Sequence, residues 1–188
     1  TGKFLGSAQP PINGKTPADL QSAYKISTSG SSSTIIAIVD AFGYTNAEAD
    51  LGVYRSQFGL PACTTANGCF KKLNQRGHQK NYPAQNIGWA QESALDLDMA
   101  SAMCPGCQVW LVEADSNSLN NLSKAVNTAA ALGAHVISNS YSGGDHKSTA
   151  AFESAYDHLG VAITASTGDA GFGTGFPATS PHVTAVGG

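Results

Sequence analysis

The stretch TIIAIVD at residues 34–40 decides the fold class. It is a β-branched apolar run without hydrophobic–polar alternation, the pattern of a strand that is buried on both faces of a parallel sheet. Further along the chain, similar apolar runs alternate with helical patterns of about 11–15 residues, which is typical of βαβ crossovers. We therefore predict an α/β fold with a mostly parallel central sheet and helices on both faces.

The predicted elements cover most of the chain. Strands are expected at 34–40, 69–74, 108–113, 135–140, 161–166 and 183–186, and helices at 45–58, 89–103, 118–132 and 149–159. Thr45 and Glu48 have the spacing of a capping box at the start of the first helix. Residues 1–30 contain several prolines and little periodicity, which predicts an extended arm with one helical turn near 18–21.

Composition narrows the classes of function. The 188 residues fit one domain, and 41% apolar content favours a compact fold over disorder. Only 12% of the residues are charged and the net charge is −3, so neither nucleic acid nor an anionic membrane is an expected partner. No apolar run approaches the roughly 20 residues of a membrane span, and the N-terminus lacks a signal-peptide pattern. We expect a mature, unanchored chain.

The four cysteines form two close pairs in the sequence, Cys63 with Cys69 and Cys104 with Cys107. Together with few lysines and many small polar residues, these pairs favour a secreted protein with two local disulfides. A zinc site with four cysteine ligands is the alternative. Only the second pair has the usual two-residue spacing, and no histidine lies close to either pair in the sequence, so disulfides are the preferred interpretation.

The stretch GWAQESALDLDMA at residues 88–100 places two carboxylates inside an apolar helical pattern. The helical repeat puts Glu92 and Asp96 on one face, about 5–6 Å apart at Cβ, in a stripe with Trp89, Met99 and Met103. This stripe is expected to face protein, where an ionised carboxylate is costly unless it is paired. The pair suits proton-sharing chemistry, in which one acid tunes the other, or a structural role at a helix end or in solvent.

Polar segments follow three of the predicted strands, at the edge of a parallel sheet where binding sites form. The first is Asp40, for which a structural role is the simpler interpretation. The second, SNSYSGG at 138–144, is either an extended edge that pairs with a peptide or an ordinary glycine turn. In the third, STGDAG at 166–171, the neighbouring glycines allow close approach to Asp169, although a plain turn aspartate would fit as well.

In combination, these motifs resemble the sedolisin family of serine-carboxyl peptidases, which have a subtilisin-like fold. The matching stretches are IVDA (38–41), FGLP (58–61), ESALD (92–96), ISNSY (137–141), STGD (166–169), FPA (176–178) and VTAVGG (183–188). They occur in the family's order and span nearly the whole chain.

The resemblance implies roles for several side chains. Glu92 would be the general base for a serine nucleophile, Asp96 would orient Glu92, and Asp169 would be the acid of the oxyanion hole. The substrate cleft would be lined by Ser140, Tyr141, Ser142, Gly143 and Gly144. A carboxyl group donates a hydrogen bond only while it is protonated, and a glutamate base has a pKa of about 4, so the implied working pH is acidic.

The family's nucleophile lies in a Ser-Gly-Thr-Ser motif beyond the Gly-Gly pair at 187–188, and no Gly-Thr-Ser occurs in this sequence. The family's calcium site lies in the same later part. We therefore expect residues 1–188 to be the N-terminal part of one catalytic domain of an acid-acting endopeptidase, with a C-terminal fragment as the partner that supplies serine and calcium. The alternatives are a truncated form and a non-catalytic relative that binds peptide or protein.

Overall fold

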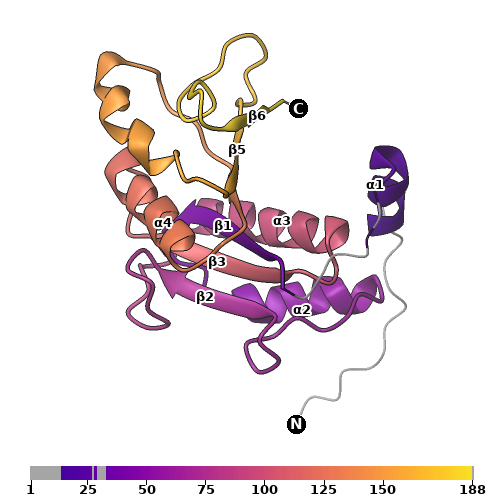
Figure 1. The fold of residues 1–188 in the computed structure, drawn as a ribbon. Coiled ribbons are helices and arrows are strands. Elements are labelled where there is room, and N and C mark those ends of the chain that lie inside the picture. The colour runs from indigo at the N-terminus through magenta and orange to yellow at the C-terminus, as the bar shows by residue number, and fades with distance from the viewer. Residues whose placement is uncertain (1–13, 27, 29–32, 188) are drawn as a thin grey trace.

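The computed structural model describes residues 14–26, 28 and 33–187. Its centre is a sheet of six strands in the order β2-β3-β1-β4-β5-β6, and every neighbouring pair is parallel (Figure 1). The strands are β1 (Ile35–Ala41), β2 (Phe70–Asn74), β3 (Gln108–Ala114), β4 (Val136–Asn139), β5 (Ala162–Ser166) and β6 (Thr184–Val186). The helices are α1 (Pro17–Tyr24), α2 (Ala47–Gln57), α3 (Ile87–Met103), α4 (Leu119–Ala131) and the 3-10 helix η1 (Lys147–Ala155). The predicted α/β class is confirmed.

Strand β1 contributes side chains to the hydrophobic core on both faces of the sheet. Ala37 and Val39 pack in the cluster that contains the buried face of α4, whereas Ile38 packs with Leu51 of α2 and Leu97 of α3. These β1 side chains are at most 1% exposed, so both faces of the strand are covered, as its sequence predicts. Burying one large aliphatic side chain in this way contributes about 1.5–3 kcal/mol. The layers therefore hold α3 firmly against the sheet.

Two of the predicted local structures are wrong. Asn46, not Thr45, precedes α2, and no side chain caps this helix. Glu48 instead accepts hydrogen bonds from the backbone and hydroxyl of Thr65, so a contact with a distant loop replaces the capping box. The helix expected at 149–159 is the 3-10 helix η1, whose three-residue turn places Thr149, Phe152 and Ala155 on the same, least exposed side.

The N-terminal arm is more helical than expected. Within the described residues it forms the two-turn helix α1, which Thr16 and Asp19 cap reciprocally. Gln21 donates a hydrogen bond of 2.6 Å to the carbonyl of Ala102, which fastens α1 to the C-terminal end of α3. The predicted extended conformation of residues 1–13, 27 and 29–30 lies outside the described residues.

Both cysteine pairs form disulfides, Cys63–Cys69 and Cys104–Cys107, so the zinc alternative is wrong. Next to them, Arg55 of α2 is only 1% exposed. Its guanidinium donates to Ser101 and to the carbonyls of Pro61 and Pro105, at 2.6–2.9 Å. Arg55 thus joins α2, the end of α3 and the two disulfide loops. Among the described residues, no helix is long and apolar enough to cross a membrane.

Candidate active site

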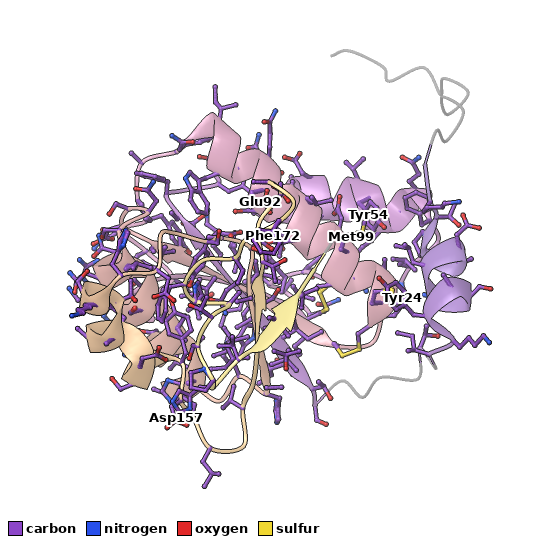
Figure 2. The ribbon with its side chains drawn as sticks, turned by 90° about the horizontal axis from the view of Figure 1, so that it is seen from above. Tyr24, Tyr54, Glu92, Met99, Asp157 and Phe172 are labelled. Atoms are coloured by element: carbon purple, nitrogen blue, oxygen red, sulfur yellow. A yellow bond between two sulfur atoms is a disulfide. The ribbon has the colours of Figure 1, made fainter. Side chains whose placement is uncertain are left out.

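Helix α3 presents the two carboxylates. Asn86 caps its start by accepting a hydrogen bond from the Trp89 amide at 3.1 Å. The fully buried face of α3 includes Ala90, Ser93, Leu97 and Ser101. The stripe that contains Glu92 and Asp96 lies beside this face and is half-buried, which corrects the expectation that it faces protein along its whole length. Glu92, labelled in Figure 2, borders a cavity and can contact a ligand there.

Asp96 is linked to the end of β4. The Ser140 hydroxyl donates a hydrogen bond of 2.8 Å to Asp96 Oδ1, whereas Oδ2 is buried and has no partner among the described residues. Burial is the main cause that raises the pKa of Asp96 to about 6; the Ser140 hydrogen bond opposes this rise, and the charge of Glu92 adds to it. Asp96 is therefore largely protonated in mild acid.

Glu92 and Asp169 lie within electrostatic reach of each other. Burial raises the pKa of Glu92 above its ordinary value, and the negative charge of Asp169 raises it further. Asp169 belongs to the loop between β5 and β6, which approaches the end of β4: a Cβ atom added at Gly168 would lie 3.4 Å from Ser142 Oγ. The sheet thus brings together residues that are far apart in the sequence.

The segment 140–144 is extended, and one of its edges is already paired. The amide and carbonyl of Gly143 both bond to Phe176, at 2.8 and 3.0 Å. In an extended segment the backbone groups of the neighbouring residues, Ser142 and Gly144, point to the opposite edge, and no described residue pairs with them. The backbone groups of Gly143 are thus occupied by Phe176, whereas those of Ser142 and Gly144 have no backbone partner among the described residues.

Tyr141 lines the cavity mainly as a buried residue. Its side chain is only 8% exposed, and its hydroxyl donates to Asn139 at 2.8 Å and contacts the hydroxyl of Tyr156 at 3.2 Å. Burial raises the pKa of Tyr141 well above its ordinary value. Its phenol is therefore a buried structural group, although Tyr141 still borders the cavity described below.

Asp40, at the end of β1, is completely buried. Neither of its carboxylate oxygens accepts a hydrogen bond from a described residue, and the nearby Ser93 hydroxyl does not meet hydrogen-bond geometry. Burial, and after it the charge of Asp96, raise the pKa of Asp40 well above its ordinary value, while Ser93 opposes the rise in part. Burial of Asp40 therefore favours its protonated form.

Sequence reasoning missed Glu113 and Phe42. Glu113 is the penultimate residue of β3, pairs with Asp40 of β1 and is 1% exposed. It accepts a hydrogen bond of 2.7 Å from the Tyr44 amide and lies 3.6 Å from Lys72. Phe42 borders a cavity of about 620 Å³ that is also lined by Trp89, Glu92 and residues 140–142. The position of Glu113 near the end of a predicted strand could have marked it as a candidate site residue. The sequence around Phe42 did not indicate that this residue borders a cavity.

The described residues contain no group of three or more histidine, cysteine, aspartate or glutamate side chains that could hold a metal ion.

No family model and no curated protein matches the sequence. Among solved structures, the chain is similar to a Pseudomonas sedolisin, a serine-carboxyl proteinase complexed with two molecules of pseudo-iodotyrostatin. The TM-score is 0.76 and the identity 22%, over 93% of this chain and 54% of that protein. A lanthipeptide protease (TM-score 0.61, 17% identity, 92% of this chain and 53% of that one) and the protease domain of PatA (0.58, 17%, 85% and 58%) are also similar. The fold is that of subtilisin-like proteases, and the chain spans about half the length of these relatives.

Proposed function

We propose that this chain is the N-terminal part of a secreted, acid-acting serine-carboxyl endopeptidase. Glu92 accepts the proton of a serine nucleophile, Asp96 positions Glu92, and Asp169 donates a hydrogen bond to the oxyanion. One set of contacts supports this assignment most strongly: Ser140 donates to Asp96 at 2.8 Å beside the cavity that Glu92 borders, and the loop of Asp169 approaches Ser142 of the same segment.

The protonation states favour acidic conditions. Below about pH 6, Asp96 carries a proton that it can donate to Glu92, which leaves the negative charge on the base. Glu92 must be ionised to accept a proton. Because its pKa is raised, activity should be lost at a higher pH on acidification than it would be with an ordinary glutamate as the base. A carboxyl group donates a hydrogen bond only in its protonated form, so the proposed role of Asp169 requires its neutral form. The two disulfides support the proposal that the protein is secreted.

The serine is proposed to come from a C-terminal segment or fragment of the same protein. An open groove of about 420 Å³ runs between α3 and the sheet, lined by Ile36, Ile38, Asp96, Met99, Ala100, Met103, Val136, Ser138 and Thr164. A largely apolar groove of this size is costly to leave in water, and a covering segment would bring its own side chains next to Asp96. Calcium binding, which the resemblance to sedolisins implies, is proposed for that same segment.

The test is the Glu92→Gln variant of the full-length protein, assayed for peptide cleavage at about pH 4. We expect cleavage to fall by at least about 10²-fold, because the amide cannot accept the serine proton. Asp98→Asn is the matched control, since it removes a carboxylate from the same helix but outside the site. Retained activity in Glu92→Gln would refute the assignment. Peptide binding by the wild-type protein without any turnover would instead identify a non-catalytic relative.

A further inference from the structure

The cavity beside Glu92 has an aromatic wall. Phe42 follows β1 and Trp89 lies in the first turn of α3, and their ring centroids are 6.5 Å apart at an interplanar angle of 56°. Both rings are half-buried against the main core, so their inner edges are fixed while their remaining surface borders the cavity. Residues 140–142, from the end of β4, form another part of the lining. The cavity therefore lies between the base and the free peptide-pairing edge.

Phe42 has a backbone conformation that its residue type disfavours. Its φ angle is +62°, in the left-handed region, where a bulky residue is a rare outlier and glycine is the usual choice. Glycine at this position would relieve the strain but would remove half of the aromatic wall. Strained residues persist where the surrounding structure fixes them, and they are concentrated at functional sites.

Three consecutive amides hold Phe42 in place. The Phe42 amide donates to the carbonyl of Ala114 at 2.7 Å, the Gly43 amide to Ala84 at 2.9 Å, and the Tyr44 amide to the buried carboxylate of Glu113 at 2.7 Å. Lys72 adds a hydrogen bond of 2.8 Å to the carbonyl of Tyr44. The turn is thus fixed from β2, β3 and the 84–85 segment, and its rigid geometry directs the ring of Phe42 at the cavity.

We propose that Phe42 is the specificity-determining residue of this cavity, which receives a large apolar side chain, such as leucine or phenylalanine, from a bound peptide near the scissile bond. This inference rests on the proposed peptidase function. The phenyl ring and Trp89 offer apolar surface to the bound side chain, and the fixed turn lets them do so without reordering. An alanine side chain at the same position of the peptide would leave the cavity unfilled.

The experiment compares variants at Phe42 in the full-length protein. Fluorogenic peptides carry alanine, leucine or phenylalanine at one position at a time, and kcat/KM is measured for each. We expect the wild-type protein to prefer leucine or phenylalanine over alanine by about tenfold or more at one position. Phe42→Gly relaxes the backbone, so it should fold, and it should reduce that ratio by about tenfold at this position alone. Phe42→Tyr keeps the wall and should retain the ratio.

The control is Tyr24→Ala, which removes an exposed aromatic ring from α1, at the opposite end of α3 from Glu92 (Figure 2). An unchanged ratio in Phe42→Gly would overturn the inference. The same preference can be measured without turnover, as the ratio of the dissociation constants of these peptides for Glu92→Gln, determined by calorimetry. If the wild-type protein cleaves nothing, the proposed peptidase function fails, while the binding ratio with and without the ring still decides the role of Phe42.

Discussion

Asp98 offers a quantitative test of the electrostatics around α3. It is half-buried on the side of α3 that faces α2, where its charge also reaches Tyr44 and Tyr54. Burial first, and the charge of Asp50 second, raise its pKa from 3.8 to about 7. Asp50 is meanwhile held by a hydrogen bond from the Tyr44 hydroxyl. Ionisation of Asp98 is therefore less favourable in the folded protein than in the unfolded chain.

The sign and size of the effect follow from proton linkage. The folded chain binds the Asp98 proton more tightly than the unfolded chain, so stability falls as the pH rises from about 4 through 7. At about 1.36 kcal/mol for each tenfold change in proton affinity, ionisation would cost up to about 4 kcal/mol. Because Asp98 is only half-buried, solvent screening reduces this cost to about 1–2 kcal/mol. Asp98→Asn should recover that amount at pH 8 and change little at pH 4.

The assay is urea unfolding followed by circular dichroism at pH 4 and pH 8, with both disulfides intact. Asp157→Asn is the control, because the Asp157 side chain is 62% exposed and its removal should change stability by less than about 0.5 kcal/mol. The reasoning would be refuted if Asp98→Asn were no more stable than the wild-type protein at pH 8. Equal stabilisation at both pH values would also refute it, because the effect would then not come from charge.

Three further predictions test the site and the turn that supports it. Asp169→Ala should lower kcat by about 10²–10³-fold, whereas Asp169→Asn, whose amide can still donate a hydrogen bond to the oxyanion, should retain more activity. Ser140→Ala should raise the pKa of Asp96 above about 6, as measured by carboxyl NMR titration, because a hydrogen bond to the ionised form is lost. Gly43→Ala should lower the free energy of unfolding in urea by at least about 2 kcal/mol, because the new Cβ would lie 2.3 Å from the Pro83 carbonyl oxygen. The control Gly52→Ala, whose Cβ would meet nothing within 4 Å, should stabilise α2 by about 0.5–1 kcal/mol.

The features that sequence predicted well depend on short-range patterns. The unbroken apolar run at 34–40 predicted a strand with two buried faces because a parallel sheet covered by helices leaves no solvent-facing side. The disulfides were predictable because each pair is separated by only a few residues, which keeps the two cysteines close in any compact fold. The common face of Glu92 and Asp96 followed from helical geometry alone.

The features that sequence missed depend on contacts between distant segments. Glu48 bonds to Thr65 instead of capping its own helix, and a capping box cannot reveal such a competing partner. The left-handed conformation of Phe42 is imposed by hydrogen bonds to segments about 40 and 70 residues away. The adjacent Gly43 marks a turn in the sequence, but it does not show that Phe42 itself takes the conformation that glycine usually adopts. Tyr141 borders the cavity, but the core partners of its hydroxyl, Asn139 and Tyr156, could not be read from the sequence.

The acidic side chains around α3 share one property that links stability to the proposed chemistry. Burial is the first cause of a raised pKa for Asp40, Glu92, Asp96, Asp98 and Glu113. Each of these groups holds its proton more tightly in the folded chain, so their combined contribution to stability is greatest in acid and is lost as the pH rises through their raised pKa values. In the proposed reaction one carboxyl group acts as the base in its ionised form, while another acts as the oxyanion acid in its protonated form. Both forms can be present together only at acidic pH. The burial that orients Glu92 and Asp96 thus favours the folded state in the pH range where the proposed reaction would run.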